Sequence, residues 1–96
     1  SPPPFHSLQQ NYPNPFNSQT TIAYDLPTGS HVLLELYNAV GQHVMTLLDE
    51  FQNAGRRKEL LEVGSLASGV YLYRLTAEPQ SQSLKYSQTK KLLLIK

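Results

Sequence analysis

The chain contains no cysteine and no tryptophan. Without cysteine it cannot form disulfides, thiolate zinc sites or a cysteine nucleophile. The lack of tryptophan removes the largest aromatic platform for stacking on sugar rings. Long apolar runs are also absent: Leu92–Ile95 has only four residues, whereas a membrane-spanning helix needs roughly 18. Membrane insertion is therefore not expected.

Positive charge is missing from more than half of the chain. Residues 1–55 contain no lysine or arginine, and residues 56–96 contain all eight. The net charge is only +1, and clusters such as Arg56–Lys58 are typical of solvated strand faces. Nucleic-acid binding would require a basic surface interleaved with aromatic platforms, which this pattern does not indicate.

Length and composition indicate one small folded module. The 96 residues suffice for a single core but leave little room for a catalytic cleft. With 40% apolar and 16% charged residues the chain is an ordinary globular sequence. Ser1–Pro4 has the composition of an extended linker. We therefore predict a linker remnant over residues 1–7 and one domain over residues 8–96, cut from a longer protein.

The first half of the domain has the two-residue periodicity of β-strands. Apolar residues alternate with others over 21–26 and 32–37, and the intervening Pro and Gly predict a hairpin turn. A second turn follows at 38–42. For residues 43–49 we prefer a strand with a bulge, because strict alternation fails there. A short helix over 40–51 is the alternative, because four apolar residues in it have helical spacing.

The second half continues the same pattern. We predict strands over 57–62, 70–77 and 89–96, and a mobile polar loop over 78–88. About seven short strands separated by turns, without a convincing helix, predict an all-β fold in which two antiparallel sheets form a sandwich.

The segment Asn11-Tyr12-Pro13-Asn14-Pro15-Phe16-Asn17 is incompatible with a helix or a central strand. Each proline lacks an amide donor and restricts the residue before it to extended conformations. From these residues alone, the segment is an edge strand or loop that holds two large side chains and caps one end of the core.

No pattern of catalytic or metal-binding residues is present. His6, His31 and His43 are too widely spaced to form a local metal pair. Asp49 and Glu50 are the only adjacent carboxylates, and they lie near a turn. The chain has no nucleophile elbow and no phosphate-binding loop. We expect no enzyme activity, no metal and no cofactor.

Sugar binding is the alternative that the residues leave open. Sandwich modules bind sugars by stacking aromatic rings on them. Tyr37 alternates with core positions and is expected to be exposed, and Tyr86 falls in the predicted loop 78–88. These two tyrosines are the candidate platforms.

Several blocks resemble one known family. Gln10–Asn17, followed by Thr21–Pro27, is similar to the opening of the C-terminal sorting domain of the type IX secretion system. Further blocks match in order, so that the resemblance covers nearly the whole chain: Val32–Gly41, Ala54-Gly55, Leu66–Leu75 and Lys90–Lys96. Two positions depart from the pattern. Ser18 stands where the family usually has proline, and Leu61 stands where it often has tryptophan, which predicts a smaller core at that end.

The resemblance implies an immunoglobulin-like sandwich related to the domain of flagellar hook-capping proteins. It also implies a non-catalytic module that directs an attached secreted protein from the periplasm through the outer membrane. The implied partners are the outer-membrane translocon, the processing machinery and an N-terminal cargo domain. The module would then be cleaved off or would anchor the cargo at the cell surface. We expect a monomer. The alternative is a carbohydrate-binding or structural accessory module of a secreted glycoside hydrolase.

Two sets of site residues follow from these interpretations. The expected fold-shaping residues are Tyr12, Pro13, Pro15, Phe16, Gly69, Val70 and Tyr71. The last three resemble the tyrosine corner of immunoglobulin-like folds, with a plain core tyrosine as the alternative. The expected partner-recognition residues are Lys90, Lys91 and Lys96, on a last strand whose exposed edge would offer unpaired backbone groups to a receptor.

Overall fold

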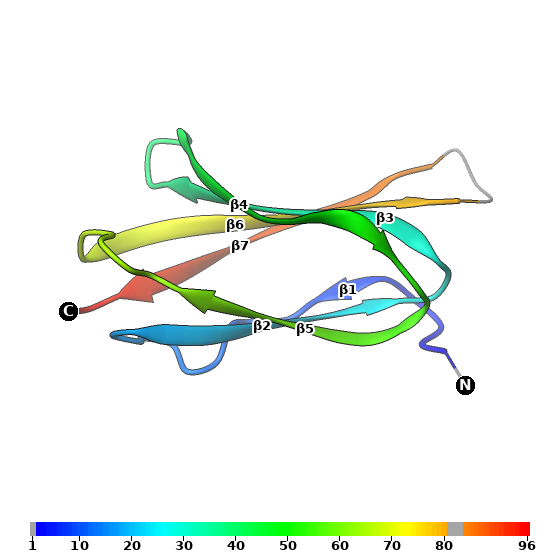
Figure 1. Cartoon of the computed structure of the whole chain (residues 1–96), viewed down its shortest axis with the longest axis horizontal. Coiled ribbons are helices and arrows are strands. Elements are labelled where there is room, and N and C mark those ends of the chain that lie inside the picture. The colour runs from blue at the N-terminus through cyan, green and yellow to red at the C-terminus, as the bar shows by residue number, and fades with distance from the viewer. Residues whose placement is uncertain (1, 81–83) are drawn as a thin grey trace.

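The computed structural model describes residues 2–80 and 84–96. Over these residues it is an all-β sandwich of two antiparallel sheets, as predicted (Figure 1). One sheet has the strand order β1-β2-β5 and the other β4-β3-β6-β7. The described residues contain no helix that is long and apolar enough to cross a membrane. The strands are β1 (Ser7–Leu8), β2 (Gln19–Leu26), β3 (Ser30–Asn38), β4 (His43–Gln52), β5 (Gly55–Glu62), β6 (Gly69–Pro79) and β7 (Tyr86–Leu94).

The core lies between the two sheets and is built from alternate residues of each strand. Ile22 and Tyr24 from β2 are fully buried, as are Leu34 from β3 and Leu75 from β6. Successive side chains on a strand point to opposite faces, so the two-residue periodicity places these residues inward. Each large apolar side chain so buried stabilises the fold by about 1.5–3 kcal/mol.

Residues 43–52 form a strand, so the strand prediction is confirmed and the helical alternative is wrong. The pairing of β4 with β3 shifts register twice, and the two shifts leave Val44 and Leu47 without an opposite residue. These are two of the apolar residues that break strict alternation. Each bulge inserts one extra residue, so the bulges account for the helix-like spacing.

The predicted loop over 78–88 is wrong at both ends, and its residues 81–83 lie outside the described residues. Strand β6 extends to Pro79, and β7 begins at Tyr86 rather than at residue 89. Tyr86 is in register with Ala77 of β6. The start of β7 is polar because this strand lies at the edge of its sheet, and polarity therefore did not indicate a loop.

The loop before β6 is fastened by the hydroxyl of Tyr71, which donates a hydrogen bond to the carbonyl oxygen of Ala67 at 2.6 Å. This contact ties the start of β6 to the backbone four residues upstream. Gly69 has a φ of 154° between the two residues, and glycine adopts positive φ without steric cost. The hydroxyl contact has the form of a tyrosine corner.

Replacing Tyr71 by Phe should remove this hydrogen bond and little else. We expect the free energy of unfolding to fall by about 1 kcal/mol, the usual net value of a neutral hydrogen bond. Urea denaturation would measure the change. Tyr12→Phe is the matched control, because the Tyr12 side chain is 81% exposed. Equal stability of the two variants would show that the Tyr71 hydroxyl does not hold the loop.

Candidate functional site

Strand β7 is an edge strand, but half of its outer edge is covered. We call residues 9–16, which lie between β1 and β2, the strap. The amide of Phe16 donates to the carbonyl of Leu93 at 3.1 Å, and the amide of Ile95 donates to the carbonyl of Phe16 at 2.9 Å. The strap thus pairs in parallel with the end of the last strand. The expectation that the edge of the last strand is exposed is therefore corrected at Leu93 and Ile95.

Two strap side chains add further bonds to the same edge. The amide of Leu93 donates to Asn14 Oδ1 at 2.9 Å. Gln10 Nε2 donates to the carbonyl of Lys91 at 2.6 Å. Residues on one edge of a strand alternate, so the strap covers the outward backbone groups from Lys91 to Ile95. The outward edge at Ser87 and Thr89, both exposed, carries no strap hydrogen bond within the described residues.

The hydroxyl of the core residue Tyr73 holds the strap on its inner side by two hydrogen bonds. This hydroxyl donates to the carbonyl of Gln9 at 2.7 Å and accepts from the amide of Asn11 at 2.9 Å. Asn11 is itself buried, and its Nδ2 donates to Thr20 Oγ1 at 3.0 Å and to the carbonyl of Pro13 at 3.2 Å. Sequence analysis included Asn11 in the proline-containing segment but missed the hydrogen bonds of Asn11 and Tyr73, because these bonds join distant parts of the chain.

The two rings of the strap lie in different surroundings. Phe16 is 5% exposed and belongs to the core, whereas Tyr12 is 81% exposed. Tyr12 contributes through its backbone, which exchanges two hydrogen bonds with Thr21. Pro13 and Pro15 both follow cis peptide bonds. The strap therefore caps one end of the core through the Phe16 ring only.

The three candidate lysines do not form one patch. Lys90 and Lys91 are successive strand residues, so they point to opposite faces. Lys91 is exposed on the outer face, and Lys90 is half-buried on the side of Leu92. Lys96 lies beyond β7, where its Nζ donates to the carbonyl of Gly64 at 2.9 Å. Lys90 and Lys91 thus flank the edge of β7, and Lys96 marks the end of the strand.

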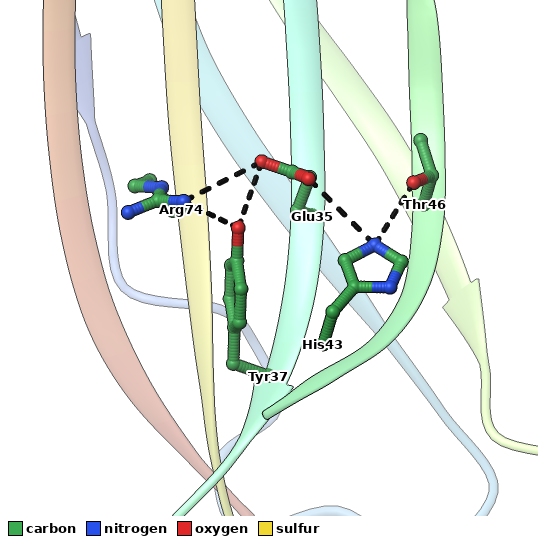
Figure 2. Close-up of polar contacts among 5 residues, drawn as sticks. All are labelled: Glu35, Tyr37, His43, Thr46 and Arg74. Carbon is green, nitrogen blue, oxygen red and sulfur yellow. Dashed lines mark hydrogen bonds and ion pairs between the residues drawn. The ribbon is translucent and has the colours of Figure 1, made fainter. Parts of the chain in front are cut away.

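A polar cluster covers the outer face of the larger sheet, as Figure 2 shows. The hydroxyl of Tyr37 donates to Glu35 Oε1 at 2.9 Å and accepts from Arg74. The guanidinium of Arg74 lies over the Tyr37 ring, 4.8 Å from its centroid. His43 packs edge-on against the same ring at 5.6 Å, and its Nε2 is 3.6 Å from Glu35 Oε2.

Both candidate sugar platforms are therefore occupied by side chains of this chain. Tyr37 is half-buried rather than exposed, and its ring packs against Arg74 and His43. Tyr86 lies in β7 rather than in a loop, and its ring stacks on His6 at 4.8 Å with an interplanar angle of 12°. Burial raises the pKa of both tyrosines. Neither ring is arranged as the flat, open platform that sugar binding needs.

The part of the chain that is described shows no cluster of potential metal ligands. Its residues include no group of three or more histidine, aspartate and glutamate side chains placed to hold a metal ion. The closest pair is His31 Nε2 and Asp49 Oδ1, 2.5 Å apart and half-exposed between β3 and β4. A single exposed pair of this kind contributes little.

Comparison with known families identifies the module. The family of secretion system C-terminal sorting domains matches residues 10–93. The chain belongs to this family. The match begins in the strap and ends in β7, so it includes both sides of the contact described above. The resemblance seen in the sequence is thereby confirmed.

Comparison with solved structures supports the fold of the sorting domain. The crystal structure of dimeric latent PorU from Porphyromonas gingivalis superposes with a TM-score of 0.72 over 90% of this chain, at 19% identity. The sorting domain spans only 9% of that chain. Comparison with curated proteins finds no match.

Family membership gives the function in outline. The domain is a C-terminal sorting signal for type IX secretion. Such a signal implies contact with the type IX machinery and attachment to a cargo protein. It also implies export through the outer membrane to the cell surface or the exterior. Sorting domains are in general non-catalytic.

Alkaline pH should destabilise the domain partly through Tyr73. Burial raises the pKa of Tyr73 to about 12, from an ordinary value of 10.0. The unfolded chain loses this proton first, so the stability from neutral Tyr73 is complete below pH 10 and is lost as the pH rises towards 12. Urea denaturation between pH 8 and pH 11 should show a shallower loss for Tyr73→Phe than for the wild type. Parallel curves would contradict the burial of this hydroxyl.

Proposed function

We propose that the sorting domain carries an N-terminal cargo domain through the periplasm to the outer-membrane translocon, which recognises the uncovered part of β7. The observation that carries the proposal is the open outward edge at Ser87 and Thr89, next to Lys90 and Lys91. An open strand edge offers backbone donors and acceptors to an added strand. Backbone hydrogen bonds to the added strand would supply affinity, and the neighbouring side chains would fix the register in which that strand pairs with β7.

The position of the lysines favours an acidic partner strand. Lys91 is on the outer face and Lys90 on the inner side, so an added strand meets a positive charge on either face. Carboxylates on that strand would pair with both, which speeds encounter and disfavours uncharged competitors. Lys96 adds a charge at the end of the strand, where its contact with Gly64 also positions the backbone.

Residues 1–5 are proposed as the remnant of the linker to the cargo, because Ser7 already belongs to β1 and the His6 ring stacks on Tyr86. The domain is proposed to act as a monomer without a cofactor. After export, the processing machinery removes the domain or uses it to hold the cargo at the cell surface. The covered platforms at Tyr37 and Tyr86 support this proposal over a sugar-binding module.

The lysines can be tested by export of a fluorescent reporter fused in front of residues 1–96 in a host with the type IX system. Lys90→Glu/Lys91→Glu should reduce surface or medium fluorescence about tenfold, the effect of losing roughly 1.4 kcal/mol of recognition energy. Arg56→Glu/Lys58→Glu is the matched control, because these exposed residues of β5 make the same charge change on the other sheet.

Equal export of both variants, with the fold intact by circular dichroism, would show that these lysines do not mediate recognition. Retention of the wild-type fusion in the periplasm would instead contradict sorting by this domain in that host.

A further inference from the structure

A hollow lies on the outer face of the larger sheet and reaches the uncovered part of β7. Its volume is about 240 Å³, and it is lined by Tyr37, Gly41, Leu72, Arg74 and Thr89. The Leu72 side chain and the Tyr37 ring give it an apolar lining, and Arg74 supplies a positive charge at its rim. Thr89 belongs to β7 and is exposed. The hollow therefore adjoins the strand edge at which we propose recognition.

The register of β6 and β7 shows how the hollow is reached from that edge. Arg74 lies opposite Thr89, and Leu72 lies opposite Lys91. The Thr89 side chain is short, so it forms only a low wall between the hollow and the outward edge of β7. A side chain of a strand added to this edge can pass over Thr89.

Arg74 is suited to hold an aromatic ring in the hollow. Its guanidinium lies over the Tyr37 ring, 4.8 Å from the centroid, and its Nη2 is 3.7 Å from Glu35 Oε1 (Figure 2). The Arg74 side chain is still 44% exposed. A guanidinium can stack on aromatic faces. Because Glu35 already balances its charge, a second ring fits this position better than a second carboxylate.

An added strand places one particular residue at the hollow. In antiparallel pairing on Ser87 and Thr89, the residue opposite Thr89 projects its side chain to the same outer face. Neighbouring strands lie about 4.8 Å apart, so only a large side chain extends across Thr89 to Leu72. The residue opposite Thr89 is therefore expected to be aromatic.

The same register places carboxylates on the side of the lysines. The residue before the aromatic one lies opposite Lys90, and the residue before that lies next to Lys91. Regular pairing ends there, because Gln10 Nε2 already donates to the carbonyl of Lys91. The Lys91 side chain is exposed on the outer face and can still meet a carboxylate at this point. Acidic residues at both positions complement the two charges.

We propose that the sorting domain recognises an extended partner segment in which two acidic residues precede an aromatic residue, and that the aromatic ring fills the hollow against Arg74. This inference rests on the proposed function, because it uses the same edge of β7. The backbone hydrogen bonds at Ser87 and Thr89 admit any extended segment. The ring in the hollow distinguishes the partner from other acidic strands.

The test is an NMR titration of the isotope-labelled 96-residue chain with a capped peptide of sequence Thr-Asp-Glu-Phe-Thr-Val. We expect the amide signals of Thr89 and Gly41 to shift with a Kd below about 1 mM. Gly41 lines the hollow away from β7, so its shift reports the ring. The peptide with Ser in place of Phe should bind about tenfold more weakly and leave Gly41 unchanged.

A domain variant tests the same contact from the other side. Leu72→Ser removes the apolar floor and should weaken binding of the Phe peptide about tenfold without changing that of the Ser peptide. Thr76→Ser, on the same face of β6 but outside the hollow, is the control and should bind both peptides as the wild type does. If Leu72→Ser does not fold, Arg74→Lys serves instead, because lysine keeps the charge and loses the planar stacking surface.

Two results would overturn the proposal. Equal affinity for the Phe and Ser peptides would refute the hollow and leave the strand edge as the recognition site. Unchanged spectra with either peptide at several millimolar would refute the acidic and aromatic partner segment. The export of the Lys90→Glu/Lys91→Glu reporter then decides separately whether the lysines next to this edge take part in sorting.

Discussion

The contact between the strap and β7 is the constraint on which the rest of this structure depends. The strap leaves β1, which belongs to the smaller sheet, and bonds to the edge of the larger sheet at Leu93 and Ile95. It therefore joins the two layers along one side of the sandwich. Buried Phe16 and the Tyr73 hydroxyl hold it in place from the core side. An edge strand that would otherwise be open is thereby closed over half of its length.

This closure limits which backbone groups of β7 a receptor can bind. Backbone groups that already pair with the strap, including the carbonyl of Lys91, are not available for strand addition, so the recognition that we propose is confined to the part of β7 before Lys91. In that proposal the positive charges of Lys90 and Lys91 attract an acidic partner strand. The polar cluster around Glu35 and Arg74 occupies the outer face instead of a sugar-binding platform.

The central strands were predictable because each pairs with a strand on both sides and keeps its own alternation of buried and outward residues. β2, β3 and β6 keep strict alternation, and Ile22, Leu34 and Leu75 are buried as the pattern predicts. The edge strands were harder to predict from the sequence. β4 has two bulges that shift its apolar residues out of phase, and β7 begins with polar residues because one of its edges faces solvent. An edge position is a property of sheet order, which local sequence does not contain.

The sequence by itself determined the sandwich, its turns and its family, because these follow from two-residue periodicity, from the restrictions of proline and glycine, and from motifs that are local. Only the tertiary structure decided which of these motifs contact one another. The Asn14 side chain meets Leu93 across 79 positions of the chain, and the Tyr73 hydroxyl meets Gln9 across 64. Such pairings arise when both sheets pack on one core, and no local pattern specifies which distant backbone group will lie within bonding distance.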